Sequence, residues 1–167
     1  MERVTLDVVD PGSAGARWAM SQYFEELAAR FPGGFAPGDA LDVAASRYKA
    51  PTGLFVVARA ADETIGCGAL DFVDDTSAEI KRMWISPPRR GIGLGRRLLA
   101  QLEDEAWSAG RSRVILDTNG SLREAIAMYE AAGYDRTDRY NDNPYAEHWF
   151  VKILGATGTA SSGNMAG

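Results

Sequence analysis

Residues 84–99 read WISPPRRGIGLGRRLL, with three glycines at alternate positions between two arginine pairs and a leucine run directly after them. Residues 78–85 have the pattern of a strand, and the leucines after the glycines recur at helical spacing. A strand, a glycine loop and a helix N-terminus form an anion site, because the N–H groups of the first helical turn point outward and the helix dipole is positive there. We therefore expect this loop to hold a small polyanion.

Two well-known phosphate-binding patterns do not fit these glycines. A Walker A loop needs GxxxxGK followed by Ser or Thr, and no Gly-Lys pair occurs here. A dinucleotide fingerprint needs GxGxxG, but counting from Gly91 the last glycine falls on Arg96, and counting from Gly93 it falls on Leu98. Asp117 stands near the distance expected of a ribose-binding acid, so a nucleotide-binding oxidoreductase fragment stays open as an alternative.

The pattern that fits is R-x-x-G-x-G, at residues 90–95. It resembles the coenzyme A pyrophosphate loop of the GNAT superfamily of N-acetyltransferases. The resemblance extends over residues 78–110, AEIKRMWISPPRRGIGLGRRLLAQLEDEAWSAG, and residues 113–135, RVILDTNGSLREAIAMYEAAGYD, about a third of the chain. It implies an α/β (α+β) fold in which helices flank both faces of a mixed, partly antiparallel central sheet.

The rest of the sequence agrees with such a fold. The predicted strands are residues 3–9, 54–59, 64–72, 78–85, 113–118, 134–140 and 147–153, and the predicted helices are 16–31, 40–48, 94–109 and 121–132. Ser121 and Glu124 are placed as a capping box at the start of the last helix. We predict one domain over residues 1–154 and a disordered tail over residues 155–167, which are small and polar.

Composition narrows the class of protein. The chain has 167 residues, 46% hydrophobic and 25% charged, which suits a globular domain. With one Cys and one His it has few soft ligands, so we expect no metal. The net charge of −5 argues against a nucleic-acid partner, and no apolar run is long enough for a membrane span, so we expect a cytoplasmic protein. A homodimer stays open.

The resemblance implies acetyl-CoA as the acyl donor. The backbone of Met83, Trp84 and Ile85 is expected along the pantetheine arm, with an N–H near Met83 available to the thioester oxygen. Arg90 is expected to add positive charge, although arginines at a helix start are often only solvated. Many relatives carry a CoA-contacting asparagine, for which Asn119 is the substitute here. Backbone amides of the loop are expected to hold the pyrophosphate: Gly91, Ile92, Gly93, Leu94, Gly95 and Arg96.

Two residues are predicted to act in catalysis. Glu79 lies six residues before Ile85, the spacing at which some GNAT members place a general-base glutamate. The alternative for Glu79 is an exposed carboxylate paired with Lys81 or Arg82. Tyr129 matches the family tyrosine that donates a proton to the departing CoA thiolate. The alternative for Tyr129 is a core residue, because it belongs to an apolar helical stripe.

The acceptor site is predicted from the outer segments of the chain. Side chains alternate along a strand, so Lys81 and Arg82 are expected on opposite faces, with at least one contacting substrate or CoA. By resemblance, the first two helices and the last loop supply the acceptor site, here with Tyr23, Phe31, Phe35 and Tyr145. Arg82 of the charged strand and His148 of the strand-like segment AEHWF are predicted to bind substrate as well. Acidic residues of these segments are expected to attract a cationic amine: Glu25, Glu26, Asp39, Asp42, Asp138, Asp142 and Glu147.

The function so predicted is acetyl-CoA-dependent N-acetyl transfer, directly to a primary amine of a small molecule or amino acid. Two alternatives stay open: a non-catalytic acyl-CoA sensor or scaffold of the same fold, and the oxidoreductase fragment. Cys67 lies in a predicted strand without a basic partner nearby in sequence, and is interpreted as a buried inert thiol rather than a nucleophile.

Overall fold

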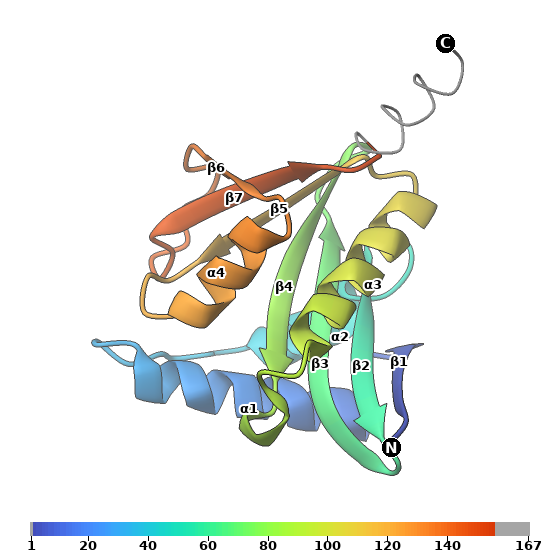
Figure 1. The fold of residues 1–167 in the computed structure, drawn as a ribbon. Helices are drawn as coiled ribbons and strands as arrows, with labels where there is room; N and C mark the ends of the chain where they lie inside the picture. Colours follow the sequence, from blue (N-terminus) through green and yellow to red (C-terminus); the bar gives the residue numbers. More distant parts are fainter. Residues whose placement is uncertain (1, 156–167) are drawn as a thin grey trace.

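A computed structural model describes residues 2–155, which fold around one seven-stranded sheet (Figure 1). The strand order is β1-β2-β3-β4-β5-β7-β6. Of these strand pairs, β4–β5 is parallel and the others are antiparallel, as the predicted mixed sheet requires. A largely parallel, doubly wound sheet is absent from the described residues, so the oxidoreductase alternative is wrong. The strands are β1 (Val4–Val9), β2 (Gly53–Ala60), β3 (Glu63–Phe72), β4 (Ser77–Ile85), β5 (Arg113–Thr118), β6 (Asp135–Thr137) and β7 (His148–Ile153).

Helices cover both faces of the sheet, as predicted. On one face, α1 (Ala14–Arg30) and α2 (Ala40–Arg47) pack on β2 and β3 through residues such as Phe24 and Phe55. On the other face, α3 (Leu94–Ser108) and α4 (Arg123–Ala131) enclose a second apolar cluster. The predicted leucine stripe of α3 is buried there, with Leu98 and Leu102 fully inaccessible to solvent. A short 3-10 turn, η1 (Pro87–Arg89), leads from β4 into the glycine loop.

The start of α4 differs from the prediction. The helix begins at Arg123 and its N-cap residue is Leu122, which makes no side-chain capping bond. The Glu124 carboxylate accepts hydrogen bonds from Arg30 of α1, and the Ser121 hydroxyl oxygen is buried without a hydrogen-bond partner. The predicted capping box is therefore wrong, because a guanidinium is a stronger donor to a carboxylate than a backbone N–H is.

A bulge in β4 changes which side chains face the same way. The register with β3 shifts between Cys67 and Ala69, and Arg82 takes a φ of 56°, in the left-handed region. A bulge adds one residue to a strand and interrupts the alternation of side chains. Lys81 and Arg82, predicted on opposite faces, consequently line the same cavity. The prediction that these two side chains lie on opposite faces of the strand is therefore wrong.

The strands β4 and β5 diverge after a short pairing, which Figure 1 shows as a wedge in the sheet. Their register covers three pairs only, from Ser77 with Arg113 to Glu79 with Ile115. Beyond it, residues 80–83 and 116–119 line opposite walls of a cavity. The divergence therefore opens the middle of the sheet.

One predicted strand is shorter in the structure, and most of the predicted tail is not covered by it. The strand expected at residues 134–140 covers only Asp135–Thr137, because the chain beyond turns into a loop that Asp117 of β5 holds through Asn141 and Asn143. The tail predicted to be disordered lies, apart from Gly155, outside the described residues. Within residues 2–155, no helix is long and apolar enough for a membrane span, and no cluster of three His, Cys, Asp or Glu side chains is placed to hold a metal ion.

Candidate active site

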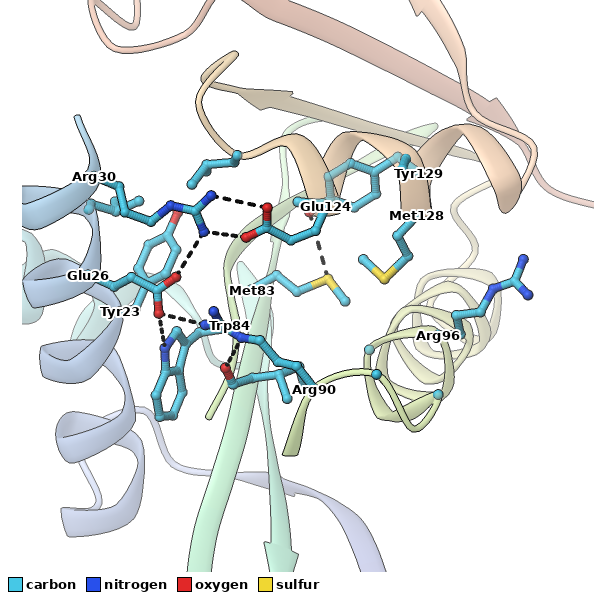
Figure 2. Close-up of a pocket in the computed structure, with 18 residues that line it drawn as sticks. Tyr23, Glu26, Arg30, Met83, Trp84, Arg90, Arg96, Glu124, Met128 and Tyr129 are labelled. Atoms are coloured by element: carbon cyan, nitrogen blue, oxygen red, sulfur yellow. Dashed lines mark hydrogen bonds and ion pairs between the residues drawn. The ribbon is translucent and has the colours of Figure 1, made fainter. Parts of the chain in front are cut away.

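The glycine loop forms one wall of a cavity of about 450 Å³, which we call the loop cavity (Figure 2). The end of β4 forms its floor, and α1, α4 and the N-terminus of α3 surround it. Its wall is mainly apolar beside Met83, Ile85 and Met128 and turns polar at the glycine loop. An elongated ligand with a flexible arm and an anionic end matches this division of the wall.

The backbone of the glycine loop is arranged to receive an anion. Gly91 and Gly93 have φ values of 82° and 88°, and a Cβ at either position would meet no atom within 4 Å. Gly93 is the N-cap residue of α3 and provides no side-chain capping bond to the first turn. The N–H groups of that turn are thus left to a ligand, and the helix dipole adds positive potential there. These observations fit a pyrophosphate.

Gly95 has a different role from the other two glycines. A Cβ at Gly95 would lie 3.0 Å from the sulfur of Met128, a tight contact between α3 and α4. Gly95 therefore allows the two helices to approach each other beside the cavity. Two other predicted CoA-binding residues lie outside the cavity lining, because Ile92 is exposed and Leu94 is buried in a core cluster.

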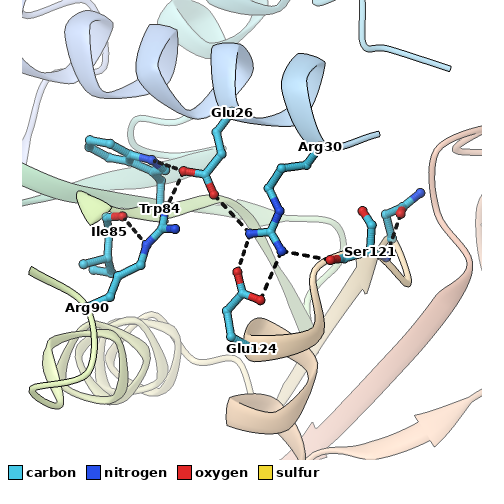
Figure 3. A network of polar contacts seen from close by, with 8 residues as sticks. Glu26, Arg30, Trp84, Ile85, Arg90, Ser121 and Glu124 are labelled. Carbon is cyan, nitrogen blue, oxygen red and sulfur yellow. Dashed lines mark hydrogen bonds and ion pairs between the residues drawn. The ribbon is translucent and has the colours of Figure 1, made fainter. Parts of the chain in front are cut away.

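A network of ion pairs crosses the mouth of the loop cavity (Figure 3). Glu26 of α1 accepts hydrogen bonds from Arg90 at 2.5 Å, from Arg30 at 3.2 Å and from the Trp84 indole at 3.2 Å. Arg30 also donates to Glu124 of α4. Burial opposes the ionisation of Glu26, but the bonds from Arg90 and Arg30 leave its pKa lowered. The network ties α1 to α4 and to the glycine loop.

The predicted arginines lie at the rim of this cavity. Arg90 is held by Glu26 and by the carbonyl of Ile85 at 2.8 Å, so its charge is partly engaged within the protein. Arg96 is exposed, and it donates a long hydrogen bond of 3.4 Å to the Ala131 carbonyl. Arg96 is therefore the freer of the two cations.

The divergence of β4 and β5 forms a second cavity of about 340 Å³, which we call the strand cavity. Residues of β4, β5, α1 and the loop before β7 line it. The two cavities share a set of lining residues, which are Tyr23, Leu27, Met83, Leu122, Ala125 and Tyr129. A group held at this junction is accessible from both sides.

Tyr129 stands at the junction, as its predicted role requires. Its hydroxyl donates to the sulfur of Met83 at 3.9 Å, and its side chain is almost fully buried (Figure 2). Burial, with smaller contributions from Tyr23 and Asp117, raises the pKa of Tyr129. The phenol therefore stays protonated at neutral pH and is able to donate a proton.

Aromatic rings predicted to bind substrate form one wall of the strand cavity. The Tyr145 ring lies 4.7 Å from that of Phe35 and 5.7 Å from that of Phe31. Asn119 positions this wall, because its amide donates to the Tyr145 carbonyl at 2.8 Å. Asn119 was predicted to contact CoA, but it lines the strand cavity rather than the loop cavity.

Glu79 and His148 lie outside the lining of both cavities. Glu79 is buried, accepts a hydrogen bond from the Tyr140 hydroxyl at 2.7 Å, and forms an ion pair with Lys81 at 3.3 Å. The pairing with Lys81 agrees with the alternative that the sequence left open, but the carboxylate is buried and not exposed as that alternative expected. The Nδ1 of His148 lies 2.7 Å from an Arg136 nitrogen, and His148 pairs in register with Thr118 of β5.

The acidic residues predicted to attract the acceptor do not line the strand cavity. Only Glu26 of that set lines either cavity, and it belongs to the ion-pair network of the loop cavity. The carboxylate that the strand cavity does contain is Asp117, which accepts hydrogen bonds from Asn141 at 2.5 Å and Asn143 at 3.1 Å. Sequence reasoning considered Asp117 only as a ribose ligand. Its position near the carboxyl end of β5, together with the asparagines of the loop before β7, was the sequence signal that could have identified it as a cavity residue.

Cys67 is buried, and burial raises the pKa of its thiol, which donates to the Arg82 carbonyl at 3.2 Å. This agrees with its interpretation as an inert thiol.

The family model described as "Acetyltransferase (GNAT) family" matches residues 20–134, more than half of the chain. The chain belongs to the GNAT acetyltransferase family. The resemblance to the GNAT superfamily seen in the glycine loop is thereby confirmed. The predicted GNAT-type sheet is confirmed as well.

Relatives and solved structures agree with this GNAT membership. An IAA acetyltransferase from Azospirillum brasilense is 40% identical over 92 residues, which cover 54% of this chain and 59% of the relative. The match thus spans little more than half of that relative. A GNAT acetyltransferase from Staphylococcus aureus has a TM-score of 0.78 at 13% identity, covering 91% of this chain and 99% of the other. A GNAT acetyltransferase from Elizabethkingia anophelis, solved with acetyl-CoA bound, has a TM-score of 0.63 at 18% identity, covering 90% and 98%.

Proposed function

We propose that this GNAT protein is an acetyl-CoA-dependent N-acetyltransferase, which moves an acetyl group directly to a primary amine of a small molecule or amino acid. The observation that carries the proposal is the junction of the two cavities at Met83 and Tyr129. A donor in the loop cavity and an acceptor in the strand cavity would meet there, which is what direct transfer needs.

The loop cavity suits acetyl-CoA. Uncapped N–H groups at the start of α3 would hold the pyrophosphate, with Arg96 and Arg90 adding charge. The apolar wall along β4 would bind the pantetheine arm. When bound, acetyl-CoA supplies an activated acetyl thioester. The solved relative from Elizabethkingia anophelis, which contains acetyl-CoA, supports this assignment.

Residues of this chain would then manage charge and protons at the junction. The bulge leaves Arg82 and Met83 without strand partners in the register, so a backbone N–H near Met83 would donate to the thioester oxygen as negative charge develops. Tyr129 would protonate the departing thiolate.

Glu79 would accept the proton of the amine through water. It does not line the strand cavity, but its ion-pair partner Lys81 does, so water would have to connect the carboxylate with the acceptor amine. Water-mediated proton transfer is an ordinary route for a general base.

The test is a panel of amines incubated with acetyl-CoA, with thiol release followed by colour and the acetylated product identified by mass spectrometry. Release of CoA together with an N-acetylated amine is expected. Tight CoA binding by calorimetry without any product over the panel would instead support the non-catalytic sensor. Failure of CoA to bind would overturn both.

A further inference from the structure

Arg82 carries a positive charge that the protein leaves unpaired. Its Nε atom is buried, and nothing in residues 2–155 accepts a hydrogen bond from it. Its guanidinium carbon lies 5.3 Å from the ring centroid of Phe24 and 5.9 Å from that of Tyr48. Aromatic faces stabilise a cation, but they leave the donors of its planar fork without acceptors.

Apart from the exposed Arg96 at the glycine loop, the other cations that line the two cavities are engaged in ion pairs. Lys81 pairs with Glu79, Arg90 with Glu26, and Arg30 with Glu26 and Glu124. Arg82 has no such carboxylate among the described residues, although it lines the strand cavity. Burying an unsatisfied charged donor is costly, so its persistence at this position points to a ligand as the acceptor.

The backbone supports the same conclusion. Arg82 holds a φ of 56°, which is rare for a residue with a side chain. The bulge that contains it turns the guanidinium toward α1 and the strand cavity instead of the opposite face. Strained backbone conformations concentrate at binding and catalytic sites, where the surrounding structure maintains them.

A negative group faces Arg82 from the other wall of the cavity. Asp117 lines the β5 side, and its carboxylate is held by the neutral amides of Asn141 and Asn143 rather than by a cation. Its charge is therefore not neutralised within the protein. The strand cavity thus presents an unpaired cation on β4 and an unneutralised anion on β5.

We propose that the acceptor is a small amine that also carries an acidic group, either a carboxylate or a phosphonate. Arg82 binds the acidic group through its planar fork, and Asp117 binds the ammonium before the amine is deprotonated. The volume of about 340 Å³ suits a ligand of amino-acid size. This inference rests on the proposed function, because it takes the strand cavity as the acceptor site.

Matched acceptors give the first test. Wild-type protein is assayed with β-alanine and β-alanine amide, and with 2-aminoethylphosphonate and ethylamine. We expect kcat/KM for one or both acidic amines to exceed that of the matched amine without an acidic group by about 10- to 100-fold, as for a charge-assisted hydrogen bond. The two pairs distinguish a carboxylate from a phosphonate. An equal or higher kcat/KM for the amines without an acidic group would overturn the inference while leaving the proposed function intact.

Variants at Arg82 give the second test. Arg82→Gln is expected to raise the KM of the acidic amine and to leave the KM of the amine without an acidic group nearly unchanged, so that the preference for the acidic amine is lost. Arg82→Lys is expected to restore part of this preference. Arg59→Gln, an exposed arginine on β2 outside both cavities, serves as the control. An equal loss with both acceptors in Arg82→Gln would mean a structural role.

Binding separates failure of the inference from failure of the proposed function. With CoA bound, calorimetry should show a lower Kd for the acidic amine than for its amide in wild-type protein, whether or not turnover occurs. The same measurement decides the case if Arg82→Gln does not fold. Equal affinities for the two compounds would refute the acidic-acceptor assignment even if acetyl transfer to another amine were found.

Discussion

The hydroxyl of Tyr129 lies 3.9 Å from the sulfur of Met83, at the place where the loop cavity and the strand cavity meet. Every role proposed for the site depends on this position, because a thioester at the junction would lie within reach of the phenol.

Tyr129→Phe is expected to lower kcat by roughly 10²-fold, because the thiolate loses its proton donor. The KM for acetyl-CoA should change little. Steady-state kinetics with the best acceptor of the amine panel measures both. Tyr134→Phe is the matched control, since its hydroxyl bonds Glu103 at 2.8 Å, and Tyr134 lines neither cavity. An unchanged kcat in Tyr129→Phe would remove Tyr129 from the proton-donor role.

Gly93→Leu is expected to weaken CoA binding by about 10-fold or more, because a side chain would occupy the space of the pyrophosphate. Gly110→Leu is the matched control: Gly110 has a φ of 84°, close to the 88° of Gly93, and lies at the other end of α3. Both variants should lose about 1–2 kcal/mol of stability from left-handed strain. Calorimetry with CoA and thermal melts separate the two effects. Equal CoA affinities would contradict the loop site.

Glu79→Gln is expected to lower kcat/KM by about 10²-fold or more in steady-state kinetics, because the amine loses its proton acceptor. Tyr140→Phe removes only the 2.7 Å hydrogen bond to this carboxylate and should keep most of the activity. A wild-type kcat/KM in Glu79→Gln would leave Glu79 with only its ion pair to Lys81.

Asn119→Ala is expected to raise the acceptor KM by about 3- to 10-fold, because the loop that carries Tyr145 loses a hydrogen bond. The Kd of CoA should stay at its wild-type value, since Asn119 lines the strand cavity only. The opposite pattern, a weaker affinity for CoA with an unchanged acceptor KM, would restore the CoA contact that the sequence predicted.

Glu124→Gln is expected to flatten the acid side of the stability profile. Hydrogen bonding from Arg30 lowers the pKa of Glu124 from 4.5 to about 2. Because the folded pKa is the lower one, the stabilisation is present above pH 4.5 and is lost as the pH falls toward 2. The exposed pair contributes about 0.2–1 kcal/mol. Melting temperatures between pH 2 and 6 should therefore fall more steeply in wild type than in the variant. Parallel curves would contradict the pairing.

The sequence predicted the parts of this protein that depend on local pattern. The buried stripe of α3 and the glycines before it follow from spacing along one segment, and both appear where expected. The antiparallel pairing of β2 with β3 also follows from two adjacent strand patterns.

The parts that sequence reasoning missed depend on contacts between distant segments. The alternation of side chains along a strand could not reveal the bulge at Arg82. The spacing of Ser121 and Glu124 could not show that both contact Arg30, which lies 91 and 94 positions before them in the sequence. The separation of β4 from β5 moved Asn119 and Asp117 to the strand cavity. No local pattern encodes such a separation.

The three residue pairs between β4 and β5 are the sheet connection between its two halves, β1–β4 and β5–β7. An extended ligand lying between residues 80–83 and 116–119 would occupy the place that further strand pairing takes in a continuous sheet. Binding would then complete the architecture as well as fill a cavity. Amide protons on both flanks of the wedge should exchange more slowly once acceptor and CoA are present together.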